Sequence, residues 1–249
     1  MINKEKIYIP YLNQERNLHI YVPDNKKQEK LPVLYMFDGH NLFYDNDATY
    51  GKSWGLKKYF DKHQIQMIIV GIECNHENNE RLNEFSPYSF HDEYWGTIQA
   101  SGHSFLEWMS SDLKTYIDTH YPTITDRSNT FIGGSSMGGL MSIYGGAIFH
   151  SFYSKAICIS PFLEYVQKQL ETDLSKIKSL KDTTFYLSFG QKEFKTRRML
   201  AIGCEANLAI ARILEKKQAE VYTHCMINGR HDEASWEKEI PLFIKDLFK

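Results

Sequence analysis

The fold of this chain is decided by the stretch Thr130-Phe-Ile-Gly-Gly-Ser-Ser-Met-Gly-Gly-Leu140, which sets Gly134, Ser136 and Gly138 in a Gly-x-Ser-x-Gly pattern. A short apolar run precedes Ser136 and a helix-like run follows it. This arrangement is typical of a nucleophile elbow, a sharp strand-to-helix turn in which glycines leave room for tight folding. The turn would force the hydroxyl outward, and the following helix would direct free N–H groups at an oxyanion. Because the pattern is short, the interpretation depends on partners elsewhere in the chain.

Length and charge narrow the class of protein. A chain of 249 residues can bury one sizeable core, and we expect a single domain over residues 1–249. Lys and Arg number 29 against 31 Asp and Glu, without a long run of either sign. This balance argues against nucleic acid or an anionic membrane as a partner. The start of the chain lacks an apolar signal segment and no stretch approaches about 18 apolar residues, so we expect a soluble, cytoplasmic protein.

The cysteines predict neither a disulfide framework nor a metal site. Cys74, Cys158, Cys204 and Cys225 lie far apart, without Cys-x-x-Cys spacing. Cys158 and Cys225 fall within apolar runs, which predicts two buried thiols in a reducing compartment. Cys74, His76, Glu77 and Glu80 are close in sequence, but the segment lacks a second ligand pair with helical or knuckle spacing. We therefore predict no metal and no cofactor.

Strand-like and helix-like runs alternate along most of the chain. Two strands are expected at residues 6–12 and 17–22, joined by a polar turn at 13–16, and further strands at 32–37, 66–72, 129–134, 155–160, 185–190 and 220–227. Helices are expected at residues 54–63, 104–121, 162–170 and 204–217, after Ser136, and from 233 to 248 with an interruption at Pro241. An initial antiparallel hairpin followed by this alternation predicts an α/β-hydrolase fold, with a mostly parallel sheet and helices on both faces. A polar connection as long as residues 75–102 is usually functional or mobile, and the sequence does not decide whether it forms a lid.

The partners of Ser136 follow from the ends of the strands. In an α/β-hydrolase sheet the catalytic groups occur in the order Ser, Asp or Glu, His, each at the C-terminal end of a strand. His231 directly follows the last expected strand, and Glu193 follows the strand that ends at Gly190. Glu193 is therefore expected to hold the His231 tautomer and to stabilise the imidazolium.

Other titratable residues fit this order less well. Asp232 is adjacent to His231, so its side chain is poorly placed to reach the far ring nitrogen. Asp182 precedes its strand and would lie at the wrong end of the sheet. His224 lies within a strand, where a position in the core or at an edge is expected.

The oxyanion hole requires two backbone N–H donors. One belongs to the residue after the nucleophile, which is Met137, and the other to the loop after the third strand. That loop is Asp38-Gly39-His40, and we expect the His40 N–H to be the second donor.

Several further stretches resemble one known family. They are residues 34–43 (Leu-Tyr-Met-Phe-Asp-Gly-His-Asn-Leu-Phe), 53–55 (Ser-Trp-Gly), 81–87 (Arg-Leu-Asn-Glu-Phe-Ser-Pro), 133–139, 160–162 (Ser-Pro-Phe) and 229–236 (Gly-Arg-His-Asp-Glu-Ala-Ser-Trp). With these, the chain resembles the putative-esterase family of α/β hydrolases, which includes esterase D-like enzymes, feruloyl esterases and enterochelin-type siderophore esterases. The markers run from about residue 31 to residue 240, nearly the whole chain.

The resemblance implies a serine carboxylic-ester hydrolase, with the Asp-Gly turn in the oxyanion loop and the loop around Arg81 near the pocket. Many relatives carry glutamine after the Asp-Gly pair, so His40 leaves open a side-chain contribution to substrate preference. The candidate substrate contacts are Gly39, Trp54, Arg81, Arg197 and Arg198. Among them, Arg81 is expected to pin its loop by a salt bridge and Trp54 to pack, while Arg197 and Arg198 either receive an anionic group or form a solvated face.

Residues and resemblance together predict hydrolysis of a small-molecule carboxylic ester through an acyl-enzyme on Ser136. Three alternatives stay open on the same fold: a ferric-siderophore trilactone esterase, an acyltransferase and a non-catalytic binding protein. The sequence specifies neither the acyl and alcohol groups nor the oligomeric state.

Overall fold

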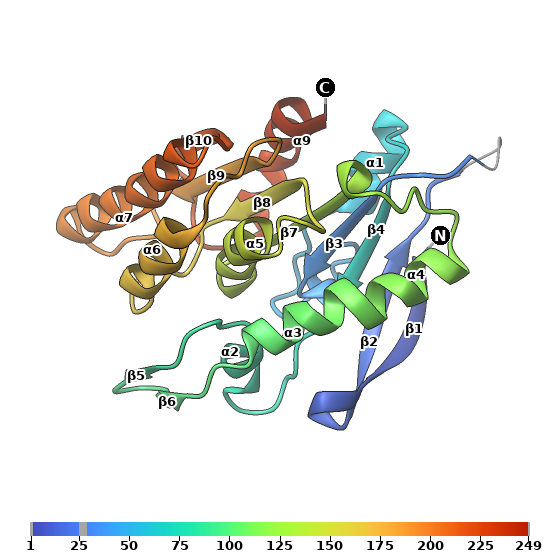
Figure 1. Ribbon diagram of the computed structural model, residues 1–249, viewed down its shortest axis with the longest axis horizontal. Helices are drawn as coiled ribbons and strands as arrows, with labels where there is room; N and C mark the ends of the chain where they lie inside the picture. The colour runs from blue at the N-terminus through green and yellow to red at the C-terminus, as the bar shows by residue number, and fades with distance from the viewer. Residues whose placement is uncertain (1, 25–28, 249) are drawn as a thin grey trace.

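The computed structural model describes residues 2–24 and 29–248; Met1, residues 25–28 and Lys249 lie outside the described residues. Its main feature is an eight-stranded sheet with the order β1-β2-β4-β3-β7-β8-β9-β10. The strands are β1 (Ile2–Ile9), β2 (Gln14–Tyr21), β3 (Val33–Phe37), β4 (Ile68–Ile72), β7 (Thr130–Ser135), β8 (Lys155–Ile159), β9 (Thr184–Gly190) and β10 (Glu220–Met226). The β1–β2 and β2–β4 pairs are antiparallel, and every pair from β4 to β10 is parallel. The predicted sheet is confirmed, with the hairpin at one end and β10 at the other (Figure 1).

Helices cover both faces of this sheet. They are α1 (Leu56–His63), α2 (Glu80–Glu84), α3 (Gly102–Trp108), α4 (Lys114–His120), α5 (Met137–Ile148), α6 (Gln167–Lys176), α7 (Arg197–Lys216), α8 (Glu233–Trp236) and α9 (Ile240–Phe248). A π-helical segment, Met109–Leu113, joins α3 to α4, and α8 continues through a 3-10 turn at Glu237–Glu239 into α9. Figure 1 shows α3, α4, α5 and α6 on the side of the sheet toward the viewer.

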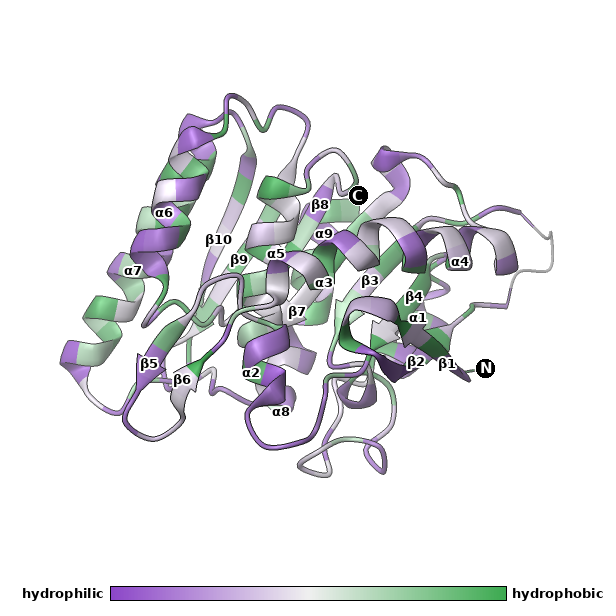
Figure 2. Ribbon diagram, turned by 60° about the horizontal axis from the view of Figure 1, so that its bottom comes forward, coloured by the Kyte–Doolittle hydropathy of each residue, from purple (hydrophilic) through white to green (hydrophobic). Residues whose placement is uncertain are grey.

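The central strand β3 shows how the sequence builds two cores. Successive side chains of a strand point to opposite faces. Val33, Tyr35 and Phe37 enter the core beneath α3 to α7, and Leu34 and Met36 enter the core beneath α1, α8 and α9. Because both faces are buried, the strand is a continuous apolar run, as expected for a central parallel strand. The hydropathy colouring in Figure 2 shows green strands inside helices whose outer faces are purple.

The carboxyl ends of the parallel strands meet along one edge of the sheet, as they do in any parallel sheet. The segments that follow β3, β4, β7, β8, β9 and β10 all start there. Figure 2 turns this edge toward the viewer and shows α2, α8 and the two-stranded β5–β6 hairpin (Phe90–Asp92 and Gly96–Ile98) along it. The residues predicted to carry the chemistry are therefore gathered at one edge.

Several predicted boundaries were wrong. The first strand runs from Ile2 to Ile9, and a 3-10 turn at Pro10–Leu12 follows because proline has no N–H to donate to a ladder. The helix expected at 162–170 is α6, which begins only at Gln167. The helix expected from residue 204 begins at Arg197, where the Thr196 hydroxyl caps it by accepting from the Met199 N–H at 3.1 Å. Pro241 lies in the first turn of α9, a position that proline tolerates.

The connection over residues 75–102 contains α2 and the β5–β6 hairpin rather than irregular loop alone. Its aromatic side chains pack on the segment before α6: the Phe90 and Tyr165 rings stack with centroids 5.2 Å apart. On its other side, Glu84 forms a buried ion pair with Arg16 of β2. The connection is thus anchored to the rest of the molecule at Glu84 and at Phe90.

The cysteines divide between core and surface. Cys158 is fully buried in β8, as predicted, but Cys225 is exposed. The prediction for Cys225 was wrong because β10 is an edge strand, and a strand-like pattern does not reveal a strand's place in the sheet order. Among the helices of the described residues, none has the length and apolar character needed to span a bilayer.

Candidate active site

Ser136 occupies the turn between β7 and α5 with a strained backbone, at φ 58° and ψ −120°. A side-chain carbon at Gly134 would lie 2.9 Å from the Gly138 backbone, so the turn requires glycine at that position. The Ser136 N–H donates to the Ile159 carbonyl at 3.0 Å, and the Ser136 carbonyl accepts from the Phe162 N–H at 3.0 Å. These bonds tie the turn to the end of β8. Strain of this kind is typical of functional sites.

Glu193 and His231 are brought together from the ends of β9 and β10. Glu193 Oε2 lies 3.2 Å from His231 Nδ1. Glu193 Oε1 accepts from the Gly190 N–H at 2.5 Å, which orients the carboxylate. The Glu193 side chain is buried, whereas the His231 ring is 43% exposed. Within the described residues no hydrogen bond joins Ser136 to His231, and in structures without a substrate such bonds are often long.

Ser160 completes this cluster and was not predicted as a site residue. It follows β8 with a positive φ of 47°, and its hydroxyl donates to Glu193 Oε1 at 2.6 Å. The same hydroxyl oxygen accepts from the Trp236 Nε1–H at 3.0 Å. The Trp236 ring in turn lies edge-on to the His231 ring, with centroids 5.2 Å apart. The only sequence signal was the Ser160-Pro161-Phe162 family marker, which carried no assigned role.

The loop after β3, which was predicted to supply an oxyanion-hole donor, is tightly folded and closely packed. Asp38 has a left-handed backbone, and a 3-10 turn at Gly39–Asn41 follows it. A side-chain carbon at Gly39 would lie 2.5 Å from the Gly71 carbonyl carbon, so the loop packs directly on β4. Arg81 donates two hydrogen bonds of 2.7 Å to the Asp38 carboxylate, which confirms the predicted salt bridge. Burial would raise the pKa of Asp38, but the Arg81 charge outweighs it and holds this pKa below its usual range.

The predicted N–H donors lie on two elements at this edge. Met137 is the first residue of α5, and the N–H groups of a first helical turn have no partner within the helix. His40 lies in the 3-10 turn, and its imidazole is buried, with Nε2 3.0 Å from the Thr49 hydroxyl. Burial lowers the pKa of this imidazole and so favours its neutral form.

A cavity of about 300 Å³ opens beside Glu193 and His231. Its lining is mostly apolar, with Phe162, Leu163, Phe189, Phe194, Met199 and Ile202 among the lining residues. Polar groups from Glu164, Gln167 and Asn207 complete the wall. Phe162 and Leu163 belong to the stretch that was predicted to be helical, so their apolar character reflects a cavity wall and not a helix face.

The remaining predicted substrate contacts are distributed differently. Trp54 is 2% exposed and packs against Trp236 with centroids 5.8 Å apart, so it lies in the core. Arg197 lines a second, more open depression of about 700 Å³, together with Lys192, Lys195 and Arg230. Arg198 is exposed and does not line it.

A second buried carboxyl group lies behind the Glu193 cluster. Glu239 is 2% exposed, and its Oε2 accepts from the Tyr186 hydroxyl at 3.0 Å. Burial raises the pKa of Glu239 to about 7. The hydrogen bond from Tyr186 lowers this pKa, and the negative charge of Glu193 raises it further.

This pKa predicts a specific pH dependence of stability. The unfolded carboxyl has a pKa near 4.5, so the native state binds more protons between pH 4.5 and about 7. The stabilising contribution is complete below the unfolded pKa and is lost as pH rises through the folded pKa. The free energy of unfolding of wild type should therefore fall, relative to that of Glu239→Gln, by about 2 kcal/mol as the pH rises from 5 to 8. Urea unfolding of both proteins across this range measures the difference. The exposed control Glu215→Gln should show no such change, and identical pH profiles for Glu239→Gln and wild type would refute this origin.

The fold and the site together define a class of protein. A serine at a strained strand-to-helix turn, with a carboxylate-bound histidine after the last strand of a mostly parallel sheet, is the arrangement of α/β hydrolases. A family model described as Putative esterase matches residues 9–247. The chain belongs to this esterase family and is an ester hydrolase.

Solved structures with the same fold include several esterases. A ferulic acid esterase aligns with a TM-score of 0.73 at 16% identity, covering 100% of this chain and 99% of that one. An enterobactin esterase from Shigella flexneri gives 0.77 at 16% identity, covering 100% of this chain but 59% of that one. An S-formylglutathione hydrolase from Staphylococcus aureus gives 0.67 at 16% identity, covering 100% and 99%. At these identities the likeness shows the fold alone.

Proposed function

We propose that the protein hydrolyses carboxylic esters through an acyl-enzyme on Ser136. The observation that carries the proposal is the contact between Glu193 and His231 at the same sheet edge as the strained Ser136 turn. With Nδ1–H donating to Glu193, His231 Nε2 holds a lone pair and can remove the Ser136 proton as the hydroxyl attacks the ester carbonyl. The Met137 and His40 N–H groups stabilise the oxyanion of the tetrahedral intermediate.

The same groups complete the acylation step and then carry out the deacylation step. His231 transfers its proton to the leaving alcohol, which leaves the acyl group on Ser136. A water molecule then attacks the acyl carbonyl while His231 accepts its proton. As the intermediate collapses and releases the acid, the bond between the acyl carbon and Ser136 Oγ breaks and His231 returns the proton to that oxygen. No cofactor enters these steps.

The cavity beside His231 supports a preference in the substrate. Because His231 protonates the leaving group, a cavity against this ring lies on the leaving-group side of the reacting carbonyl. Its Phe162, Phe189 and Phe194 side chains favour an apolar or aromatic group. We therefore propose esters of aromatic or medium-sized apolar alcohols as the preferred class.

Two measurements test this function. The first is turnover of a panel of esters in which the alcohol varies from ethanol to aromatic alcohols at a constant acyl group, where rates should rise with the apolar size of the alcohol. The second is labelling by a fluorophosphonate probe, followed by peptide mapping, which should place the adduct on Ser136. Absence of both turnover and labelling would favour a non-catalytic binding protein.

A second candidate, hydrolysis of an anionic ester such as a ferric-siderophore trilactone, rests on the depression lined by Lys192, Lys195, Arg197 and Arg230. Arg230 is adjacent to His231 in the chain, which places positive charge near the reaction centre. Arg197→Ala should then raise KM for the anionic ester several-fold and leave neutral esters unchanged, whereas Arg198→Ala, its exposed neighbour outside the depression, should change neither. No turnover of any anionic ester by wild type would exclude this candidate.

Ser160 is proposed as a positioning residue for Glu193. Ser160→Ala removes one hydrogen bond to the carboxylate and leaves the Trp236 N–H without its acceptor. We expect kcat to fall about 10-fold, because a hydrogen bond to a charged group is worth about 1.5–3 kcal/mol, part of it kept by the Gly190 N–H. The less stabilised carboxylate should also move the acidic limb of the kcat/KM profile to higher pH.

The control for this variant is Ser154→Ala, which removes another buried hydroxyl at the far end of β8. It should leave the pH profile unchanged. An unchanged profile for Ser160→Ala as well would show that the Ser160 hydroxyl is structural only.

A further inference from the structure

Three potential metal ligands meet at the ends of two neighbouring strands. His40 follows β3, and Cys74 and His76 follow β4, the strand that pairs in parallel with β3. One ligand atom from each residue lies within 4.8 Å of the other two. His40 and Cys74 are buried, and His76 is exposed. The cluster therefore has a buried base and one side chain that reaches solvent.

Within the described residues, His40 Nδ1 has no hydrogen-bond partner, and the partner of His76 Nδ1 is Cys74 Sγ. His40 Nε2 lies 3.0 Å from the Thr49 hydroxyl, while its Nδ1 is buried and has no hydrogen-bond partner within the described residues. His76 Nε2 lies 3.6 Å from a carboxylate oxygen of Glu73. Metal-binding histidines typically use one ring nitrogen as ligand and donate from the other to a carboxylate, a carbonyl or water. A buried, unpartnered imidazole nitrogen is otherwise costly.

Cys74 supplies the third donor. Its Sγ lies 3.8 Å from His76 Nδ1. In a tetrahedral zinc site, with bonds of about 2.3 Å to sulfur and about 2.0 Å to nitrogen, the sulfur and nitrogen ligands are about 3.6 Å apart. The Cys74 and His76 atoms thus already have nearly the separation that a bound ion requires.

We propose that His40 Nδ1, Cys74 Sγ and His76 Nδ1 form a binding site for a divalent transition metal of the zinc type, with the fourth position open to water on the exposed side of His76. Two imidazoles and a thiolate are the donors that zinc prefers. On binding, the metal–sulfur bond replaces the S–H bond of Cys74, and the released proton goes to solvent. The ion would join the loop after β3, which carries the His40 N–H, to the segment after β4.

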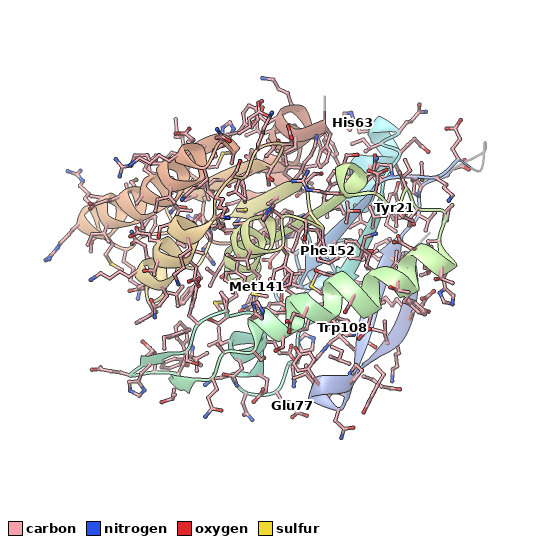
Figure 3. All side chains as sticks on the ribbon, in the orientation of Figure 1. Tyr21, His63, Glu77, Trp108, Met141 and Phe152 are labelled. Atoms are coloured by element: carbon pink, nitrogen blue, oxygen red, sulfur yellow. The ribbon has the colours of Figure 1, made fainter. Side chains whose placement is uncertain are left out.

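The acidic residues that follow His76 in the sequence do not take part. Glu77 and Glu80 are exposed and lie outside the cluster. Figure 3 shows Glu77 at the lower margin of the molecule. The sequence prediction weighed these two as ligands and missed His40, because the third ligand comes from a different strand end.

The test uses Co²⁺ in place of zinc, because thiolate-bound cobalt has a charge-transfer absorption that reports coordination by cysteine. Wild-type protein stripped with a chelator should develop this absorption with one Co²⁺ per chain. Cys74→Ser should abolish the absorption, and His76→Asn should weaken Co²⁺ binding at least 10-fold. The controls Cys225→Ser, the exposed thiol, and His91→Asn, another exposed histidine, should bind as wild type does.

Stability is the second measurement, independent of ester hydrolysis. Zn²⁺ in excess should raise the Tm of wild type and of both controls, because an ion that binds only the native state stabilises it, and should not raise that of His76→Asn. His76 is exposed, so this variant is expected to fold even if Cys74→Ser does not. Absence of the cobalt absorption in wild type, or its persistence in Cys74→Ser, would overturn the proposal.

Discussion

Ser136→Ala is expected to lower kcat for a p-nitrophenyl ester by about 10⁴-fold or more, with the fold intact. The Ser136 hydroxyl is the only protein group that forms a covalent bond to the substrate in the proposed mechanism, and it lies on the strained turn between β7 and α5. Alanine has no atom that would disturb the buried α5 helix, so stability should change little. Steady-state ester turnover measures kcat, and urea unfolding measures the stability.

The matched control is Ser142→Ala, which removes a hydroxyl further along α5, six residues after Ser136. Its Oγ donates to the Gly138 carbonyl and takes no part in the proposed chemistry. This variant should keep wild-type kcat within about threefold. If Ser136→Ala kept more than a tenth of the wild-type rate, the nucleophile would have to be sought elsewhere.

Glu193→Gln should have the next largest effect, a fall in kcat of about 10³–10⁴-fold with little change in KM. The carboxylate holds the proton on His231 Nδ1, 3.2 Å away, and stabilises the imidazolium that forms during attack. The amide is neutral, and its NH₂ group can donate to Nδ1 and so favour the tautomer that places the proton on Nε2, where it blocks the removal of the Ser136 proton. Rates measured across pH 5–9 separate this effect from a simple pKa shift.

Asp232→Asn provides the control for charge near the histidine. Asp232 is adjacent to His231, and its carboxylate caps α8 by accepting from the Ser235 N–H at 2.8 Å, a role that asparagine also fills. It should retain most of the wild-type kcat. A larger loss for Asp232→Asn than for Glu193→Gln would reverse the assignment of the acid.

The sequence predicted those strands and site residues whose local residue pattern also depends on their position in the sheet. The central strands β3 and β4 are continuous apolar runs because both of their faces are buried. Such runs can be recognised as strands from the sequence alone. Glu193 and His231 were found by one rule, that groups at the carboxyl ends of parallel strands share an edge, and the structure brings them into contact. Their catalytic roles stay predictions.

The features that sequence missed depend on which segments become neighbours. The apolar residues around Phe162 line a cavity, and a cavity wall and a helix face select the same side chains. Cys225 is exposed because β10 lies at the edge of the sheet, which the strand pattern does not encode. The third member of the His40, Cys74 and His76 cluster became visible only when β3 and β4 were paired.

Because β10 lies at the end of the sheet, the two halves of the candidate site should differ in their resistance to local unfolding. β7, which leads to Ser136, is paired on both sides, whereas β10, which leads to His231, is paired only with β9. Opening of a sheet by fluctuation starts from strands held on one side, so amide protons of β10 should exchange with solvent sooner than those of β7. Under mild heating or low denaturant the protein would then lose its general base first while the nucleophile stays in place, and recovery of activity would require only the return of one strand and not refolding of the whole chain.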